Sequence, residues 1–360
     1  MAGEKGQNSL QSKRHNRGLV LRRILTGACS SRVELARATG LSKMTVTNIV
    51  AGLIAQGLVE ECEEFQTAAC GRSPIGLRLA KDAPRAAGLF IGRDRVQGVL
   101  CTLTLEELKR EEVSFRSLEK DRVPIYACEV LDRLLAGESG VLGIGAAYGA
   151  PAELRDFLEE RYRLPVLEDQ DCAAAALAES LFGAGQGVGD LLCLELGDRI
   201  GAGIVCGGAV CRGSRRLPAR MGHVCIDRNG PPCSCGGRGC LEMYAGTRVV
   251  TGRLCRATGL RLRFAQFCRL SGVAEIETIM GELARDLAAG LSGPVELFHP
   301  EMIVLGGDGI DWGDRHIRLL EEALSRGGEA IPVRRARFGK EAALMGAAAN
   351  VVSALFRGEL

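Results

Sequence analysis

Hydrophobic residues between positions 19 and 53 recur every three or four residues, in runs that glycines interrupt. This spacing places apolar side chains on one face of a helix. It predicts a helix with Leu19, Leu21, Ile24 and Leu25, which Gly27 ends, and a second short helix that Ser31 caps and that holds Val33, Leu35 and Ala36. It predicts a third helix over residues 43–56. The third helix starts after Ser42, a preferred capping residue, and its apolar stripe consists of Val46, Ile49, Val50 and Leu53.

The turn between the second and third helices contains Gly40, as a helix-turn-helix requires. Two candidate strands, residues 58–61 and 76–79, follow and are joined by a polar loop. This order predicts a winged helix-turn-helix. Polar side chains on the exposed face of the third helix, and one arginine in the loop, are the predicted DNA contacts: Ser42, Lys43, Thr45, Thr47, Asn48 and Arg72. The alternative is a small helical bundle that does not bind nucleic acid.

From about residue 85 the pattern changes to short continuous apolar runs, which are typical of buried strands. They lie at residues 88–92, 96–100, 141–147 and 165–167. An alanine-rich helix follows the last of these runs. Strands that alternate with helices predict the α/β class.

Composition limits the class of protein further. The chain has 360 residues, of which 46% are hydrophobic and 25% charged, as expected for a soluble globular protein with two or three domains. It has no run of about 18 apolar residues, which a membrane-spanning helix needs. Its first residues are polar and do not resemble a signal peptide. The chain has fifteen cysteines, an odd number without regular spacing. This pattern predicts a protein of the reducing cytoplasm rather than a disulfide-bonded secreted one.

The formal net charge of +2 hides a basic stretch near the N-terminus. Glu34 is the single acid among eight cations there: Lys13, Arg14, Arg17, Arg22, Arg23, Arg32, Arg37 and Lys43. A basic face is compatible with DNA binding, because it neutralises phosphates, although it is not specific evidence for it.

Residues 222–242 contain one histidine and three cysteines in a segment rich in glycine and proline: His223, Cys233, Cys235 and Cys240. Thiolates and a neutral imidazole are preferred ligands of tetrahedral zinc. The glycines provide the backbone freedom that a tight loop around one ion needs. A closed set of four ligands predicts a structural zinc site rather than a catalytic one. The alternative is that these are ordinary thiols in a cysteine-rich chain.

The same segment reads Gly-His, then Asn-Gly-Pro-Pro-Cys-x-Cys-Gly-x-x-Gly-Cys-Leu-Glu, and it resembles the zinc signature of the ROK family (repressors, uncharacterised reading frames and sugar kinases). Residues 16–79, with Gly-Arg-x-Pro at 71–74, look like the DNA-binding domain of ROK repressors such as the xylose and N-acetylglucosamine types. ROK sugar kinases lack this domain. The resemblance extends from residue 16 to the C-terminus.

The resemblance implies an α/β fold in which a winged helix-turn-helix precedes a two-lobed domain of the actin-like, hexokinase-like (ribonuclease H-like) ATPase type. It implies a disordered tail over residues 1–12 and a DNA-binding domain over residues 13–80. A first lobe would comprise residues 85–168 and 342–360. A second lobe, residues 169–341, would hold the zinc loop and the dimer contacts.

Two loops that bind ATP phosphates in the family's kinases are altered here. Residues Ile91 to Arg95 lack the glycines and the threonine of the Asp-x-Gly-Gly-Thr loop, whose backbone amides approach phosphates. In the second loop, Gly197 to Gly203, Arg199 replaces a glycine and should obstruct the nucleotide. Asp171 stands at the position of the family's general base. With both loops disrupted, no catalytic residue is assigned and the chain is not expected to be an enzyme.

The resemblance places a ligand pocket at Asp171, Arg220, His223 and Glu242. The family has a glutamate where this chain has Arg220, so a cationic donor replaces an acceptor of sugar hydroxyls. A loop that carries a sugar-binding asparagine in the family is also missing. Either the ligand is anionic, such as a phosphorylated or acidic sugar, or Arg220 pairs with Asp171 or Glu242 in a vestigial pocket.

The function that the resemblance implies is DNA-binding transcriptional regulation, by repression, of carbohydrate metabolism genes in response to a sugar or sugar derivative. The expected partners are a double-stranded DNA operator, a sugar-type effector and further copies of the chain, as a dimer or tetramer. Structural zinc is the expected cofactor, and the cytoplasm the expected location. The alternatives are a ROK sugar kinase that phosphorylates a hexose with ATP, and a ligand-independent DNA-binding protein.

Overall fold

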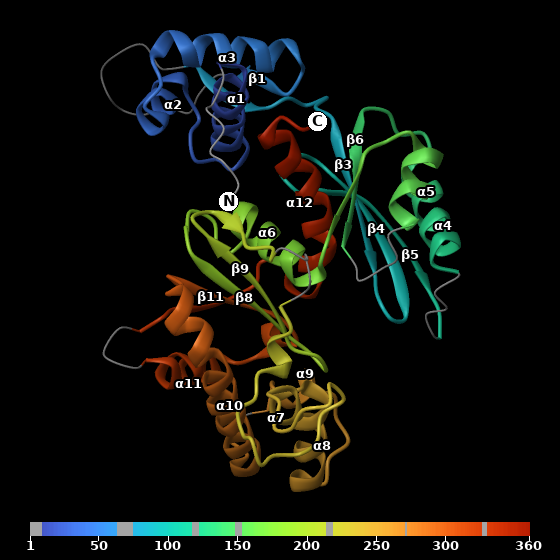
Figure 1. Ribbon diagram of the computed structural model, residues 1–360, viewed down its shortest axis with the longest axis vertical. Coiled ribbons are helices and arrows are strands. Elements are labelled where there is room, and N and C mark those ends of the chain that lie inside the picture. Colours follow the sequence, from blue (N-terminus) through green and yellow to red (C-terminus); the bar gives the residue numbers. More distant parts are fainter. Residues whose placement is uncertain are drawn as a thin grey trace. The chain divides into compact units, whose positions relative to one another are not determined.

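The structure is a computed structural model that describes residues 9–62, 75–116, 122–147, 153–213, 219–270, 272–325 and 330–360 (Figure 1). The chain forms two compact units. One comprises Met1–Glu168 and Ala347–Leu360, and the other comprises Asp169–Gly346. Among the described helices, none combines the length and the apolar character that a bilayer span needs.

The first unit begins with a winged helix-turn-helix, as the sequence predicts. Its helices are α1 (Ser9–Leu25), α2 (Arg32–Thr39) and α3 (Lys43–Ala55), and its wing is the antiparallel pair β1 (Val59–Cys62) and β2 (Gly76–Leu79). Ser31 and Ser42 cap α2 and α3, because their side chains accept the backbone N–H groups of Glu34 and Thr45. Gly40 ends α2 at a φ of 71°, which glycine adopts without strain. The residues of α3 that are fully buried are Val46, Val50 and Leu53.

The rest of the first unit is a five-stranded mixed sheet in the order β5-β4-β3-β6-β7. The elements are β3 (Arg85–Ile91), β4 (Arg95–Cys101), β5 (Glu107–Ser114), α4 (Val123–Leu135), β6 (Val141–Ala147), α5 (Glu153–Tyr162), β7 (Val166–Asp169) and the C-terminal helix α12 (Ala342–Arg357). β3, β4 and β5 are antiparallel, whereas β3 and β6 are parallel. α4 and α5 lie on one side of the sheet and α12 on the other (Figure 1).

Helix α12 approaches its neighbours closely because they have glycines at the contacts. A Cβ atom on Gly145 of β6 would lie 1.7 Å from the carbonyl oxygen of Ala347. A Cβ atom on Gly18 of α1 would lie 1.6 Å from the carbonyl oxygen of Phe356. The C-terminal helix therefore packs both on the sheet and on the first helix of the winged helix-turn-helix.

The second unit holds a five-stranded sheet in the order β10-β9-β8-β11-β12. Its strands are β8 (Leu191–Leu196), β9 (Gly201–Cys206), β10 (Ala209–Val210), β11 (Met302–Gly307) and β12 (Val333–Arg335). Its α-helices are α6 (Asp171–Phe182), α7 (Glu242–Ala245), α8 (Thr247–Thr258), α9 (Phe264–Phe267), α10 (Ala274–Phe298) and α11 (Asp314–Leu324). Short 3-10 helices lie at Met221–His223, Asp308–Asp311 and Gly339–Glu341. A core cluster of the second unit lies between this sheet and α8, α10 and α11.

Helix α6 links the core of the second unit to its candidate site. A Cβ atom on Gly203 of β9 would lie 2.2 Å from the carbonyl oxygen of Cys172, so the helix packs tightly on the sheet. Glu179 of this helix is fully buried. Its carboxylate accepts the backbone N–H groups of Ala184, Arg337 and Phe338 at 2.8–3.1 Å. These bonds satisfy the buried charge and fix the C-terminal end of α6 relative to the sheet.

Candidate functional site

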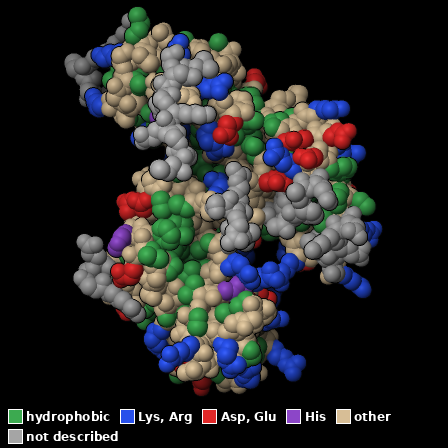
Figure 2. Space-filling view, in the orientation of Figure 1, with side chains coloured by type: hydrophobic (Ala, Val, Ile, Leu, Met, Phe, Trp, Pro, Cys, Tyr) green, Lys and Arg blue, Asp and Glu red, His purple; other side chains and the backbone are tan. Residues whose placement is uncertain are grey.

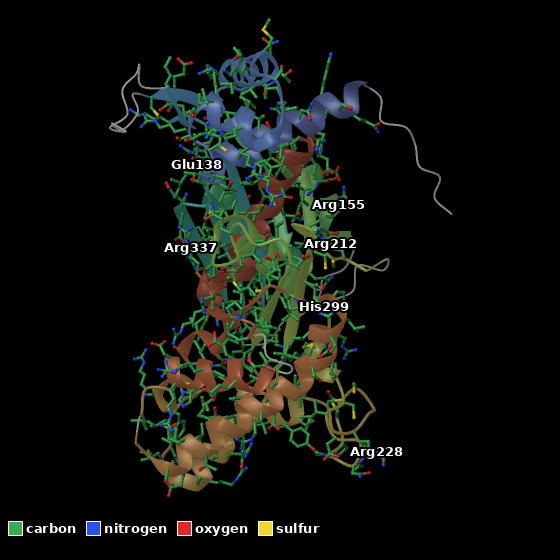
Figure 3. The ribbon with its side chains drawn as sticks, turned by 90° about the vertical axis from the view of Figure 1, so that its left-hand side faces the viewer. Glu138, Arg155, Arg212, Arg228, His299 and Arg337 are labelled. Carbon is green, nitrogen blue, oxygen red and sulfur yellow. The ribbon has the colours of Figure 1, made fainter. Side chains whose placement is uncertain are left out.

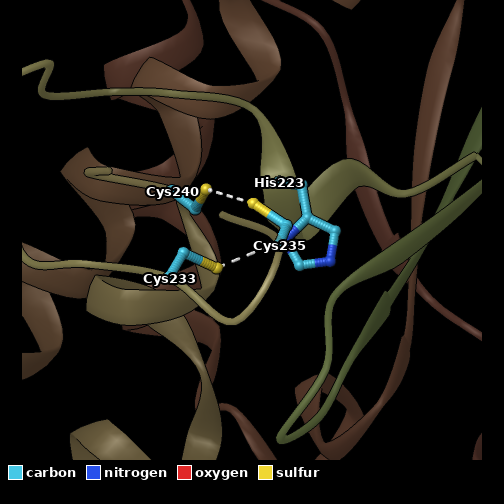
Figure 4. A group of neighbouring side chains, drawn as sticks. All are labelled: His223, Cys233, Cys235 and Cys240. Carbon is cyan, nitrogen blue, oxygen red and sulfur yellow. Dashed lines mark hydrogen bonds between the residues drawn. The ribbon is translucent and has the colours of Figure 1, made fainter. Parts of the chain in front are cut away.

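The four predicted zinc ligands lie together in the second unit (Figure 4). The ligand atoms of His223, Cys233, Cys235 and Cys240 all lie within 4.8 Å of one another. The Cys235 and Cys240 sulfurs are 3.6 Å apart, and the Cys233 sulfur is 3.5 Å from Nδ1 of His223. A tetrahedron with Zn–S bonds of about 2.3 Å has S–S edges of about 3.8 Å. The cluster therefore has the donor set and the dimensions of a structural zinc site.

The backbone of the loop holds the cysteines in place. The N–H of Cys233 donates to the carbonyl of Gly237 at 2.9 Å, and the N–H of Gly239 donates to the carbonyl of Pro231 at 2.9 Å. Gly239 has a φ of +61°, and a Cβ there would lie 1.5 Å from the carbonyl oxygen of Asp227. Any other residue at this position would force the two arms of the loop apart, so glycine is required.

Two thiols of the cluster have pKa values shifted in opposite directions. The backbone N–H of Gly237 lowers the pKa of the Cys235 thiol, because it stabilises the thiolate. Burial raises the pKa of Cys240 to about 12. Zinc binds thiolates, so a metal at this cluster would have to displace the proton of Cys240.

Arg220 contacts the histidine–cysteine cluster through His223. Its Nη2 atom lies 2.7 Å from Nε2 of His223, while Nδ1 of the same ring faces Cys233. Arginine can only donate, so this contact requires Nε2 to accept. If Nδ1 binds zinc, Nε2 instead carries the proton of the neutral ring. If His223 binds zinc, the guanidinium of Arg220 and the Nε2–H of His223 are therefore two hydrogen-bond donors that face each other.

The other two predicted ligand-binding residues have separate surroundings. Oε2 of Glu242, half-buried at the start of α7, accepts the backbone N–H of Ile200 at 3.4 Å. Asp171 is exposed at the start of α6, where its Oδ1 accepts the N–H of Cys172 at 2.8 Å. Among the described residues, Arg220 forms no ion pair with Asp171 or Glu242. Its structural partner is His223.

Sequence reasoning missed a buried ion pair beside these residues. Nε and Nη2 of Arg212 donate to both carboxylate oxygens of Asp169 at 2.5–3.1 Å, and the Asp169 side chain is only 4% exposed. The pair forms part of the wall of a cavity of about 290 Å³ that Phe298 also lines (Figure 3 labels Arg212). Because the two residues are 43 positions apart, the one available signal was the acidic run at residues 168–171.

Carboxylate groups surround the altered second phosphate loop. Oγ1 of Thr247 lies 3.2 Å from Oδ1 of Asp198 and 2.9 Å from Oδ2 of Asp308. Lys340 binds Asp308 at 2.8 Å and Asp311 at 2.9 Å. Arg199 itself is exposed. The carboxylates of Asp198, Asp308 and Asp311, with only Lys340 paired to two of them, repel the triphosphate that such a loop must hold.

The first loop is closed on itself. The N–H of Gly92 donates to the carbonyl of Arg95 at 2.9 Å, and Arg95 pairs with Asp94 at 3.1 Å. The backbone N–H of Gly92 and the guanidinium of Arg95 therefore already have partners within the loop.

The predicted DNA contacts lie on α3, except one. Ser42, Lys43, Thr47 and Asn48 are exposed, and Thr45 is half-buried. Arg72 lies outside the described residues. Lys and Arg side chains are visible over the winged helix-turn-helix, at the top of Figure 2.

Comparison with known proteins gives four relevant similarities. A sequence model of the ROK family matches residues 139–353. The xylose repressor of Bacillus subtilis is 27% identical over 316 residues, which cover 81% of this chain and 82% of the repressor. A crystal structure of a ROK family transcriptional regulator, a homologue of the Escherichia coli MLC protein, has a TM-score of 0.80 at 25% identity and covers 97% of this chain and 98% of its own. The ROK hexokinase from Thermus thermophilus is 32% identical with a TM-score of 0.63, but it covers 74% of this chain and 97% of its own.

Proposed function

The chain belongs to the ROK family, and we propose that it is a DNA-binding repressor of carbohydrate metabolism genes that responds to a sugar or sugar derivative. The observation that carries the proposal is the basic winged helix-turn-helix with a capped, exposed α3. The regulator structure covers 97% of the chain, whereas the hexokinase covers 74%. The name of the xylose repressor supports a sugar-type effector.

We assign DNA binding to residues 13–80, and we take residues 85–168 with 342–360, and 169–341, as the two lobes. Within the first segment, base and phosphate contacts are proposed for Ser42, Lys43, Thr45, Thr47, Asn48 and Arg72. The operator is double-stranded DNA. Paired reading heads of a dimer or tetramer would multiply affinity on a site with two half-sites.

Structural zinc is proposed at His223, Cys233, Cys235 and Cys240. The metal would be held by three thiolates and Nδ1 of His223, and it would order the loop between residues 222 and 242. It would also fix the direction of the His223 ring, because a ring bound through Nδ1 cannot turn. The outward Nε2 proton is then available to a ligand.

The ligand is proposed to contact Asp171, Arg220, His223 and Glu242 and to be anionic. With zinc bound, the Arg220 guanidinium and the Nε2 proton of His223 are both donors, and an anionic acceptor relieves the repulsion between them. A phosphorylated or acidic sugar meets this requirement better than a neutral sugar does.

Kinase activity is proposed to be lost. Asp171 has the position of the family's general base, but the loop that would hold ATP phosphates carries Arg199 and is surrounded by the carboxylates of Asp198 and Asp308. A base without a bound phosphoryl donor has no reaction to promote. ATP turnover with a panel of hexoses tests this directly, and turnover above a no-protein control would refute it.

The DNA proposal is tested by genome-wide mapping of the protein's binding sites, followed by gel-shift titration on a recovered site. Asn48→Ala should weaken binding by about tenfold, because a bidentate base contact contributes about 1–3 kcal/mol of discrimination. Thr278→Ala is the matched control, since Thr278 is exposed on α10 and outside the winged helix-turn-helix. Equal affinity of the Asn48 variant and the control would remove α3 as the reading surface.

The effector proposal is tested by calorimetry of the zinc-loaded protein with neutral sugars, sugar phosphates and sugar acids. Preference for the anionic compounds, lost in Arg220→Glu, is the expected result. Binding of neutral sugars alone would contradict the anionic assignment. Absence of any binding, together with intact DNA binding, would favour a ligand-independent DNA-binding protein.

A further inference from the structure

A groove separates α1, the first helix of the winged helix-turn-helix, from α3, the helix that is proposed to read DNA bases. It encloses about 380 Å³ between α1 and α3. The α1 side is formed by Lys13, Asn16 and Arg17, and the α3 side includes Thr45, Asn48 and Gly52. The groove is open, because Gly52 is exposed and no atom lies within 4 Å of the position of its Cβ.

The groove lies beside the face of α3 that is proposed to read bases. Thr45, Asn48 and Gly52 are spaced by three and four residues, so they form one stripe along the helix. Met44 and Thr47, on the neighbouring stripe, are exposed, and Met44 is 73% exposed. Asn48 belongs to the groove stripe and is next to Thr47 of the other stripe, so a ligand in the groove would touch the edge of the reading surface.

The chemistry of the groove suits an anion. Neither α1 nor α3 contains an acidic residue. Among the described residues, neither Lys13 nor Arg17 forms an ion pair. Arg17 donates to Oε1 of Gln56 at 2.5 Å, which orients the guanidinium along the groove while its other N–H groups keep their capacity to donate. Asn16 adds a neutral amide donor at the same wall.

We propose that this groove receives the phosphodiester backbone of one operator strand and that α1 positions α3 in the major groove of DNA. This inference rests on the proposed DNA-binding function. A helix of about 10–12 Å diameter fills a major groove about 12 Å wide, so its two flanks face the two phosphate walls. The wing, which follows α3 in the chain, would contact the phosphates on one side of the major groove. The phosphates on the other side would be contacted by Lys13, Asn16 and Arg17.

The first test uses two charge removals on the same helix. Lys13→Gln removes a cation from the groove, and Arg14→Gln removes one from outside it, since the Arg14 side chain packs near Gly358 at the end of the chain. Both variants change the net charge equally. Each phosphate contact contributes about 0.9 to the slope of log affinity against log salt, so Lys13→Gln should lower the slope by about 0.9 and the affinity about eightfold at 0.1 M salt. Arg14→Gln should change neither by more than a small fraction of this.

A second pair of variants keeps the inference testable if α1 tolerates substitution poorly. Gly52→Asp places a carboxylate in the groove, and Gly52→Asn places a neutral side chain of the same size there. The aspartate variant should bind the mapped site at least tenfold more weakly than the asparagine variant, with melting temperatures of the two agreeing.

The outcomes separate the inference from the proposed function. If the unmodified protein binds no DNA site, the proposed function is wrong. If it binds, but Lys13→Gln and Arg14→Gln have the same salt slope and the two Gly52 variants have the same affinity, then α1 does not contact the operator and the inference is overturned.

Discussion

Replacing Cys235 with serine should remove the metal without disturbing the packing of the loop. Cys235 is exposed, so the substitution buries no polar group and opens no cavity. Its sulfur is nevertheless one corner of the cluster, 3.6 Å from the sulfur of Cys240. A serine hydroxyl is a poor zinc ligand at neutral pH, because it is not ionised. Any loss of stability in this variant therefore reports on the metal.

The size of the effect follows from linkage between binding and folding. At free zinc about 1,000 times the dissociation constant, a site that binds only the folded state stabilises it by about 4 kcal/mol. Loss of one ligand raises that constant by at least about 100-fold, since outer-shell changes alone reach this size. The variant then retains about 1.4 kcal/mol and loses about 2.7 kcal/mol. For a unit of the size of Asp169–Gly346, this corresponds to a melting temperature about 5–11 °C lower.

The assay combines metal analysis with thermal unfolding. The protein is dialysed against a zinc buffer, its zinc content is measured by mass spectrometry, and its melting temperature is recorded with and without a chelator. Cys225→Ser is the matched control, because Cys225 is exposed in the same segment but is not part of the cluster. It should keep one zinc per chain and the original melting temperature.

Two results would refute this reasoning. One is a Cys235→Ser protein that retains a full equivalent of zinc and its melting temperature. The other is a Cys225→Ser protein that loses as much zinc and stability as the Cys235 variant, since the ligands would then differ from the four assigned here.

Three further substitutions test the packing and electrostatics of the fold. Gly18→Ala should destabilise the protein in a urea unfolding titration, because its Cβ would lie 1.6 Å from the carbonyl oxygen of Phe356. Gly52→Ala, whose Cβ would lie in open space, should instead stabilise α3 by up to about 1 kcal/mol. Equal effects of the two substitutions would refute the contact between α1 and α12. Glu179→Gln should cost about 3 kcal/mol in the same titration, since three backbone N–H groups lose a charged acceptor, and an unchanged midpoint would contradict that role. Burial raises the pKa of Glu195 to about 7, above its usual value, so the proton held in the folded state contributes stability at low pH that is lost as the pH rises towards 7. Glu195→Gln should therefore be more stable than the original protein at pH 8, by up to about 3 kcal/mol, and the difference should shrink towards pH 4.5; a pH-independent difference would contradict the burial of this carboxyl.

Local features could be predicted from the sequence because neighbours along the chain determine them. Ser31 and Ser42 cap helices through N–H groups only three residues away. The zinc ligands lie within residues 223–240, so a single loop brings them together whatever the rest of the fold does. The family motifs are continuous segments of the same kind, and the two-lobed fold follows from them. Arg72 lies outside the described residues, and its assignment as a DNA contact stays a prediction.

Only the tertiary structure decided which distant side chains meet. Arg212 and Asp169 are 43 positions apart, and nothing in either segment marks the other as its partner. The sequence offered Asp171 or Glu242 as partners of Arg220, but the folded chain brings the guanidinium to His223. Arg220 precedes a single turn of 3-10 helix and His223 ends it, so the turn brings the two side chains together. The groove between α1 and α3 likewise depends on how two helices pack, which their separate hydrophobic patterns do not specify. Periodicity and spacing fix each element and each short loop, while contacts between elements depend on the packing of the whole core.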